Sequence, residues 1–518
     1  MLRFACATAL GALLVLSTAA SNAEPTFVNG LVIPGDSVDK TGVASANGGR
    51  VGFFSDIYYD PREQQWWALS DRGPGGGVLA YETRVQRFKI DIDRKTGAIS
   101  KFKVQKTIKF SDPKGLLTPP SKADLDNPQA LNGLNPAELN GNAAVLGRSF
   151  DPEGLVVSPI NGHFIVSDEY GPSVYEFNRK GVLVKVFETP ANLLPRLQVA
   201  PGNPGDLDFV AGRADDGIFF GRQDNRGFEG IAVSPDGKKL FAVLQDPLIN
   251  EPDEPKPNDG RDGRNVRIVE FNSDRYSAGY GESTAQYAYQ LEAQADIAAR
   301  IKAQGGSASA TDPRQGRNIG LSAIVALNDH EFLVIERDNR GLGVDDPEGK
   351  MVVGSKRVYK IDISDATDVS TLVLPGSDLA GAGIIPVTKS GVFIDFTEDT
   401  VLPNGKQPEK WEGLAIGPRL SDGARLILAG NDNDFSVTQN GSNVQFDVYV
   451  DFRGSSVQRD IDQPTKLNGV EVGPVPNGYV LIPGVLHAYK ASADDLAGYV
   501  APGKRGRECK RCEEDSDD

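Results

Sequence analysis

Cysteine is scarce in this chain, with three residues in 518, at positions 6, 509 and 512. Cys6 lies in an apolar N-terminal segment and the other two lie in a charged C-terminal tail, so the core is expected to fold without disulfide bonds. Two thiols are too few for a structural zinc site. The C-x-x-C pair of the tail therefore predicts a local disulfide or a disulfide to a second molecule.

Histidine is equally scarce, and the three residues, His163, His330 and His487, are far apart in the sequence. This argues against a zinc site built on a histidine cluster. We expect each histidine to be structural, although a catalytic triad of residues distant in sequence stays open. The chain also lacks a G-x-S-x-G motif, a P-loop and a G-x-G-x-x-G motif after a predicted strand. An ordinary α/β-hydrolase esterase and a nucleotide-binding enzyme are therefore unsupported.

Long apolar runs are absent after the first 20 residues. The N-terminal run, residues 5–20, follows Arg3 and precedes Ser21-Asn22-Ala23, which resembles a signal-peptidase cleavage site. Residues 1–23 are therefore predicted to be a signal peptide that exports the protein to the periplasm or out of the cell. No later segment is long and apolar enough to span a membrane.

Basic residues are in the minority: 55 Lys and Arg stand against 71 Asp and Glu, for a net charge of −16. Such a surface repels phosphate backbones, so nucleic acid is not an expected partner. The charge fits a soluble exported protein or one that attracts cations.

The chain does contain a repeated unit of four short strand-like runs. Its clearest copy has runs at residues 154–158, 163–167, 173–177 and 182–187. The first two runs are apolar throughout, as buried strands are, and Asn and Gly mark the turns. Four antiparallel strands with the most buried strands first are typical of a β-propeller blade.

Five copies of the unit are visible, beginning near residues 52, 154, 227, 320 and 410. Repeats of this length indicate a radial or linear array. We therefore predict an all-β protein, a β-propeller of about six four-stranded blades, with five or seven blades and a pair of β-sandwiches as alternatives. The strand-like segments 26–35 and 478–492 could pair in a closing blade.

The propeller is expected to span residues 24–500, with long loop insertions and one short helix within 290–304. Segments 369–375 and 444–452 are strand-like and are expected to be outer strands of the fourth and fifth copies. The charged tail, residues 501–518, is expected to be disordered.

Acidic residues recur at one place in the unit. The first strand of three copies begins with Glu-Gly, at Glu153, Glu229 and Glu412, and a fourth copy has Ser322 near that place. In a propeller this strand lines the central channel, and the end of its antiparallel neighbour lies beside its start. The polar residues at the ends of the second strands should therefore meet the glutamates at one mouth of the channel: Asp71, Arg72, Asp168, Glu169, Glu336, Arg337 and Asp432.

Carboxylates gathered at one place raise one another's pKa unless a cation lies among them. Oxygen ligands of irregular geometry suit Ca²⁺. Arg72, Arg226, Arg337 and Arg340 add bidentate donors for a phosphate or carboxylate group. Metal, arginine and acid together form a plausible hydrolytic site. The alternative is that each acid accepts hydrogen bonds from backbone N–H groups of its own turn.

Several segments resemble a known family, the phytase-like domain described as "esterase-like activity of phytase". They include SDEYGPSVYEF at 167–177, RGFEGIAVSPDGK at 226–238 and WEGLAIGP at 411–418, within a similarity that runs over residues 52–452. The resemblance implies a secreted β-propeller, related in architecture to calcium-dependent propeller phytases, that hydrolyses esters. The chain has Ser322 where the other repeats suggest an acid, which puts a complete acidic ring in doubt.

The residue pattern and the resemblance together predict an exported, Ca²⁺-assisted hydrolase of a small anionic ester, most simply a phosphate ester. The expected catalytic residues are Glu153, Asp168, Glu169 and Glu229. The expected substrate-binding residues are Arg72, Tyr170, Arg226 and Arg337. The expected metal ligands are Asp71, Glu336, Glu412 and Asp432. The alternative function is a non-catalytic propeller that binds a ligand or a protein at the channel mouth.

Overall fold

The computed structural model describes residues 24–42, 47–118, 125, 127–200, 203–210, 218–251, 263–307, 319–439 and 444–503. The predicted signal peptide and the C-x-x-C pair lie outside the described residues.

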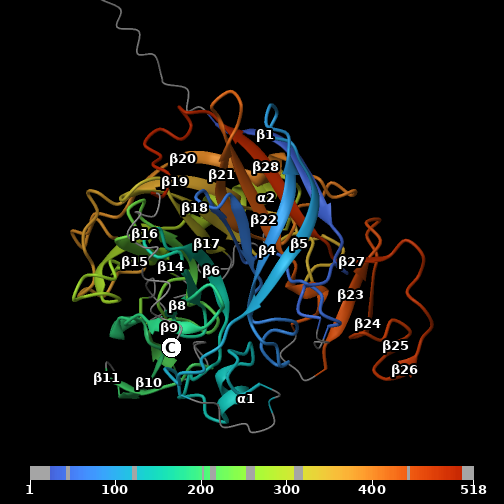
Figure 1. Cartoon of the computed structure of the whole chain (residues 1–518), viewed down its shortest axis with the longest axis horizontal. Coiled ribbons are helices and arrows are strands. Elements are labelled where there is room, and N and C mark those ends of the chain that lie inside the picture. Colours follow the sequence, from blue (N-terminus) through green and yellow to red (C-terminus); the bar gives the residue numbers. More distant parts are fainter. Residues whose placement is uncertain are drawn as a thin grey trace, which may run out of the picture.

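Five four-stranded antiparallel sheets, the blades, form the body of the described chain (Figure 1). Blade 1 contains β2 (Asp56–Asp60), β3 (Gln65–Leu69), β4 (Arg84–Ile92) and β5 (Ile99–Lys109). Blade 2 contains β6 (Pro152–Val157), β7 (Phe164–Asp168), β8 (Ser173–Phe177) and β9 (Leu183–Val186). Blade 3 contains β13 (Phe228–Val233), β14 (Lys239–Leu244), β15 (Asn265–Asn272) and β16 (Ser283–Gln290). Blade 4 contains β17 (Ile319–Ala326), β18 (Glu331–Asp338), β19 (Lys356–Asp362) and β20 (Thr388–Asp395). Blade 5 contains β21 (Lys410–Arg419), β22 (Arg425–Asp432), β28 (Gly484–Ala491) and β1 (Thr26–Ile33).

The first strands of the blades lie side by side in a closed ring. β2 contacts β6, β6 contacts β13, β13 contacts β17, β17 contacts β21, and β21 contacts β2. Strands from the two ends of the chain close the ring, because β1 pairs with β28 inside blade 5. The prediction of an all-β propeller is confirmed by this topology.

The sixth blade that the sequence suggested is not found among the described residues. The N-terminal and C-terminal strands do pair, with Phe27 opposite Tyr489, but they complete blade 5 instead of forming a blade of their own. Two outer strands were also misplaced. Residues 446–450 lie outside the ring, and Val369 begins a segment that covers blade 3 through a bond from its N–H to the carbonyl of Gln286.

Small elements surround the ring. One peripheral sheet contains β10 (Arg196–Ala200), β11 (Asn203–Leu207) and β12 (Ile218–Phe220). Another contains β23 (Phe446–Val450), β24 (Ser456–Asp460) and β27 (Val480–Leu481), next to the hairpin of β25 (Lys466–Leu467) and β26 (Val470–Glu471). The helix expected within 290–304 is α2 (Gln294–Ala303), and a further short helix, α1 (Pro136–Asn140), lies in the loop before blade 2.

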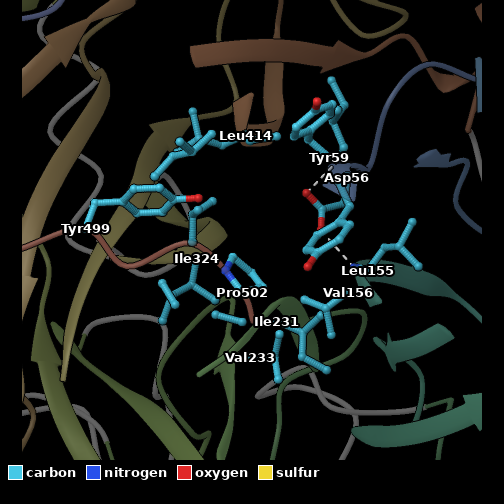
Figure 2. Close-up of a pocket in the computed structure, with 17 residues that line it drawn as sticks. Asp56, Tyr59, Leu155, Val156, Ile231, Val233, Ile324, Leu414, Tyr499 and Pro502 are labelled. Carbon is cyan, nitrogen blue, oxygen red and sulfur yellow. Dashed lines mark hydrogen bonds between the residues drawn. The ribbon is translucent and has the colours of Figure 1, made fainter. Parts of the chain in front are cut away.

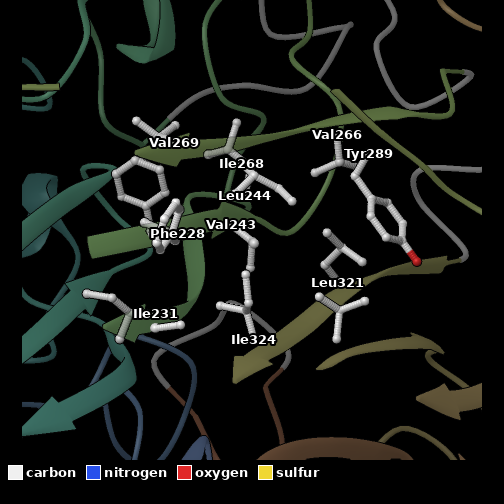
Figure 3. Close-up of a cluster of buried hydrophobic side chains, with 14 of the residues drawn as sticks. Phe228, Ile231, Val243, Leu244, Val266, Ile268, Val269, Tyr289, Leu321 and Ile324 are labelled. Atoms are coloured by element: carbon white, nitrogen blue, oxygen red, sulfur yellow. The ribbon is translucent and has the colours of Figure 1, made fainter. Parts of the chain in front are cut away.

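The core lies between neighbouring blades. Figure 3 shows Ile231, Val243 and Val266 of blade 3 facing Leu321 and Ile324 of blade 4. Because both faces of a blade are covered, strands such as β6, β7 and β8 are buried at every position. This explains why the sequence shows continuous apolar runs there.

Candidate functional site at the channel mouth

A β-bulge occurs at the same place in four of the five inner strands. In β13, β17 and β21, one residue has no partner on the second strand: Glu229, Ser322 and Glu412. In β6 the bulge places Glu153 and Gly154 opposite the single residue Ser167, whose Oγ accepts the Gly154 N–H. A bulge bends a strand and redirects the extra side chain, and bulges are frequent beside active sites. The repeated glutamates therefore owe their direction to a repeated backbone irregularity.

The glycine that follows each bulged glutamate is required by the narrow ring. A Cβ atom on Gly154 would lie 2.6 Å from the backbone N of Ile231, and one on Gly230 would lie 2.9 Å from the Cα of Ala323. Both contacts are with the backbone of the next inner strand, which cannot move aside as a side chain can. In these Glu-Gly pairs, the glycine thus meets a packing requirement and the glutamate supplies the chemical group.

At the end of a second strand, only every other side chain points to the mouth. Glu336 has the same register position as Asp168, and its carboxylate accepts a hydrogen bond from Tyr289 (2.7 Å) and pairs with Lys389. It therefore points between blades 3 and 4. Successive side chains of a strand point to opposite faces, so the next residue, Arg337, reaches the mouth instead. Glu336 belongs to none of the carboxylate groups of the described residues that could hold a metal, and the structure does not bring it to the other expected ligands.

Glu153, Glu169 and Glu229 form the carboxylate triad. One oxygen of each lies within 4.8 Å of the others, and all three residues are buried. Glu169 Oε1 and Glu229 Oε2 accept no hydrogen bond, and the described residues offer no hydrogen bond or ion pair to the Glu153 carboxylate. Burial first, and neighbouring carboxylates second, raise the pKa of Glu153 and Glu169 well above the usual range and that of Glu229 to about 8. The Arg226 guanidinium lies 3.8 Å from Glu169 Oε1. Buried carboxylate oxygens without a hydrogen bond in such a group are suitable ligands for a hard divalent cation.

A second group of acids already contains a cation. Asp71, Asp432 and Asp434 lie within 4.8 Å of one another. Lys410 forms an ion pair with Asp434, and its Nζ lies 3.6 Å from Asp432. The ammonium group therefore occupies the position that a metal ion would take in this group.

Replacing Lys410 with methionine is expected to open this second group to a metal ion. If the carboxylate triad holds one Ca²⁺ ion in the wild type, the variant should bind two per chain, because the acids lose their built-in counter-ion. Isothermal titration calorimetry measures the stoichiometry. Lys360→Met, which removes a lysine paired with Glu331 on the outside of blade 4, is the matched control and should leave it unchanged. Two ions in the wild type, or one in the variant, would contradict the assignment.

Two of the expected substrate-binding arginines form an outer layer above the acids, together with Lys410. The side chains of Arg72, Arg226 and Lys410 are 12%, 23% and 20% exposed. Their acidic partners lie deeper: Asp151, Asp246 and Asp434 are 1%, 3% and 2% exposed. An anion that approaches the mouth therefore meets cationic groups before it meets carboxylates.

Arg337 differs from the other two arginines. Its guanidinium pairs with Glu412 and lies 3.5 Å from Glu229, and its side chain is only 5% exposed. It lies next to the inner strand that carries Ser322 in place of a glutamate. Arg337 thus links two ring glutamates from within, and the structure does not place it where an approaching anion would meet it first.

Asp168, which was expected to be catalytic, is bonded within its own turn. Asp168 accepts hydrogen bonds from the backbone N–H groups of Asp151 (2.9 Å), Tyr170 (3.2 Å) and Gly171 (2.9 Å). The three donors favour the charged form and lower its pKa, but burial has the larger effect and raises the pKa to about 8. Asp168 thus stabilises its own turn. Asp151 pairs with Arg72 (3.1 Å) and lies within 4.8 Å of Asp71 and Glu153.

Three further residues of the mouth were not predicted: Asp151, Lys410 and Asp434. Two of them had a detectable signal, since Asp151 stands two positions before Glu153 and Lys410 stands two before Glu412. Tyr170, which was predicted, donates its hydroxyl to the carbonyl of Gly133 (2.7 Å), and the Arg72 guanidinium lies 5.7 Å from the centre of its ring. Tyr170 thus supports Arg72 from the side.

The channel below the mouth is narrow and apolar. Figure 2 shows Asp56, Leu155, Ile231, Ile324 and Leu414, one from each inner strand, around a cavity of about 50 Å³. A cavity of this size holds about one or two water molecules. At the far end the C-terminal segment crosses the channel, where Tyr499 and Pro502 line the cavity. A molecule much larger than water therefore does not fit in this cavity.

Several known proteins are similar to this chain. A curated relative from Arthroderma benhamiae, named "Uncharacterized secreted protein", is 25% identical over 484 residues, which cover 80% of this chain and 88% of the relative. Among solved structures, the Dos1 propeller is 9% identical with a TM-score of 0.25, over 88% of this chain and 71% of that one. A PQQ-bound aldose sugar dehydrogenase from Streptomyces coelicolor is 11% identical with a TM-score of 0.25, over 90% of this chain and 100% of that one. At such scores these structures carry no information on chemistry.

Across the described ranges, no helix combines the length and the apolar character needed to cross a bilayer. The family model described as "Esterase-like activity of phytase" matches residues 49–435, which include every blade apart from the two strands that close the ring. The chain therefore belongs to the phytase-like family.

Proposed function

We propose that the protein is an exported hydrolase of anionic esters, phosphate monoesters foremost, that works with a divalent cation held by the carboxylate triad. The observation that carries the proposal is that Glu169 Oε1 and Glu229 Oε2 are buried without a hydrogen bond, while the neighbouring Glu153 carboxylate has neither a hydrogen bond nor an ion pair among the described residues. The family membership and the secreted relative support hydrolysis and export.

The donor set fits Ca²⁺ better than a softer metal. The triad offers only carboxylate oxygens, and no histidine or cysteine belongs to the carboxylate groups of the described residues. Hard oxygen ligands favour Ca²⁺ or Mg²⁺, and Ca²⁺ accepts the less regular geometry of three different strand ends. A bound cation would neutralise the triad and polarise an oxygen of the ester.

The outer cations would orient the substrate. Arg72 and Arg226 each keep part of the guanidinium toward solvent while a carboxylate holds the other part. A planar guanidinium fixed in this way presents its remaining N–H groups in a defined direction, which suits the oxygens of a phosphate. Lys410 adds a point charge at the rim beside Asp432 and Asp434.

Asp71 is the best placed proton acceptor. It lies next to Glu153 and Asp151, and burial together with the charge of Asp151 raises its pKa to about 8. A group with a pKa near the working pH exchanges protons efficiently. The Asp71 carboxylate would accept the proton of the attacking water and later return it to the leaving alcohol.

The proposal is tested by phosphate release from phytate and from simple phosphomonoesters. We expect turnover in the presence of Ca²⁺ and its loss after chelation, with recovery when Ca²⁺ is returned. A correctly folded protein that hydrolyses none of these esters with Ca²⁺, Mg²⁺ or Mn²⁺ would contradict it.

The raised pKa values predict a pH-dependent stability of the metal-free protein. Glu229 and Asp71 have a folded-state pKa of about 8, above the ~4 of exposed carboxyl groups. The folded state therefore binds more protons, so this stabilisation is complete at low pH and is lost as the pH rises through 8. With chelator present, the melting temperature should fall by about 3–5 °C between roughly pH 5.5 and 8.5.

Added Ca²⁺ should abolish that fall, because the ion replaces the protons on the same carboxylates. Differential scanning fluorimetry across the pH range, with EDTA and with Ca²⁺, measures both effects. A metal-free melting temperature that rises over this range would contradict the assigned protonation.

One observation favours the alternative, a propeller that binds a ligand without catalysis. Each of the three predicted arginines is already paired with a carboxylate: Asp151, Asp246 and Glu412. A site whose arginines are all neutralised can hold a cation without binding an anion. A partner or ligand that is recovered equally well with the wild type and with Glu153→Gln, in the absence of any ester turnover, would support this alternative.

A further inference from the structure

Asp56 occupies an unusual place in the channel. It is the first channel-lining residue of β2, whereas the first channel-lining residue of each other inner strand is aliphatic: Leu155, Ile231, Ile324 and Leu414. Blade 1 is also the blade whose inner strand has no bulge and no bulged glutamate. A carboxylate in an otherwise apolar channel requires compensating contacts.

Those contacts join three inner strands. Asp56 Oδ2 accepts the backbone N–H of Leu155 (2.8 Å) on β6, and Oδ1 accepts that of Ile57 (2.7 Å) on β2. The backbone N–H of Leu414 on β21 lies near enough to the same carboxylate to favour its charged form. Figure 2 shows Asp56 between Leu155 and Leu414, with the bond to Leu155 drawn. The inner strands do not pair with each other in sheets, so this carboxylate links β2 to β6 by a hydrogen bond and to β21 by an electrostatic contact.

The two linked residues have a fixed relation to the mouth. Leu155 lies two positions after Glu153, and Leu414 lies two positions after Glu412. Glu153 and Glu412 lie close enough to influence each other's charge, and Glu412 also influences Asp56. A shift of β6 or β21 along the channel would therefore move a mouth glutamate by the same amount.

We propose that Asp56 is a positioning residue that fixes the inner strands of blades 2 and 5 and thereby sets the placement of Glu153 and Glu412 at the mouth. The expected effect of Asp56 on ion affinity rests on the proposed function. The clamp, by which we mean the holding of the two strands by Asp56, does not. Asparagine cannot replace it, because the amide nitrogen is a donor and would face a backbone N–H that is also a donor. The change would leave at least one of the N–H groups of Ile57 and Leu155 unsatisfied in the channel.

The test compares Asp56→Asn with Asp60→Asn. Asp60 is the matched control: it is a buried aspartate at the other end of the same strand and holds Arg62. Ca²⁺ affinity is measured by calorimetry, and backbone hydrogen exchange is measured by mass spectrometry on metal-free protein for peptides that cover 152–157 and 410–416. If Asp56→Asn does not fold, Asp56→Ser, which keeps one acceptor in a smaller volume, takes its place.

We expect Asp56→Asn to weaken Ca²⁺ binding about tenfold or more, the usual effect of losing a residue that holds a ligand in place. It should also speed exchange in both peptides, whereas Asp60→Asn should do neither. Unchanged exchange in both peptides would overturn the clamp. Faster exchange with unchanged ion affinity would show a purely structural residue and overturn the positioning role. If the wild type binds no ion, the proposed function fails, and the exchange experiment alone decides whether Asp56 holds the two strands.

Discussion

Replacing Glu153 with glutamine is expected to weaken Ca²⁺ binding at least about 100-fold, more than the loss of a residue that only supports a ligand. Glu153 belongs both to the carboxylate triad and to the group formed with Asp71 and Asp151. It is also the member of the triad without any hydrogen bond or ion pair in the described residues. The amide keeps the shape of the side chain but removes its charge, so the loss reports on the ion and not on packing. Calorimetric titration with Ca²⁺ measures it, and phosphate release should fall in parallel.

The control for this variant is Glu336→Gln. Both residues are buried glutamates that the sequence placed in the site, but Glu336 is held by Tyr289 and Lys389 between two blades. Its replacement should lower the melting temperature and leave Ca²⁺ affinity within about twofold of the wild type, as expected for a distant residue. An ion affinity that depends on Glu336 and not on Glu153 would mean that the site lies elsewhere.

Replacing Gly230 with alanine is expected to destabilise the propeller by about 3 kcal/mol, at the upper end for overpacking in a core. The new Cβ would lie 2.9 Å from the Cα of Ala323 and 3.0 Å from the backbone N of Ile324, both on β17. Neither atom can rotate away, so the two inner strands must separate. Because Gly230 follows Glu229, ion affinity should fall as well. Urea denaturation and calorimetry measure the two effects.

Ala323→Gly is the matched control for the glycine variant. Ala323 has the position after the bulge in blade 4, where a methyl group is already accommodated. Its removal should cost about 0.5–1 kcal/mol, the typical penalty for glycine in a strand. Equal costs for the two variants would show that the close approach at Gly230 does not explain the Glu-Gly pairs.

The sequence predicted the blades well where their strands follow one another directly. Blades 1, 2 and 3 match the expected runs because each strand pairs with its neighbour in the chain. Blade 5 was misjudged because the insertion between β22 and β28 contains β23, a strand-like run that pairs elsewhere. Closure by β1 is a pairing over the whole chain, and local pattern carries no information on it.

The site was predicted through its repeated glutamates and was missed where register decides. A shift of one residue reverses the direction of a side chain, so the acids at the end of a second strand cannot be assigned by proximity to the strand end alone. Glu336 and Asp168 point away from the channel, while Arg337 and Glu169 reach it. Whether a side chain reaches the channel mouth thus depends on the β-bulge. The sequence shows that bulge only as a recurring Glu-Gly pair.

The sequence also did not show which acids form ion pairs. The acids of the mouth were visible, but not which of them would be neutralised by a lysine or an arginine. The structure pairs Lys410 with Asp434 and Arg337 with Glu412, and leaves Glu153 without an ion pair among the described residues. Those pairings join residues up to 75 positions apart, so they follow from the closed ring and not from any local motif.

The decisive measurement is a crystal structure of the protein grown with Ca²⁺ and soaked with Tb³⁺, whose anomalous signal marks the ion. We expect a single peak at the mouth, with oxygens of Glu153, Glu169 and Glu229 at about 2.3–2.6 Å, the usual range for such ions. A peak confined to Asp71, Asp432 and Asp434, or no peak at the mouth with the side chains ordered, would contradict the proposed site.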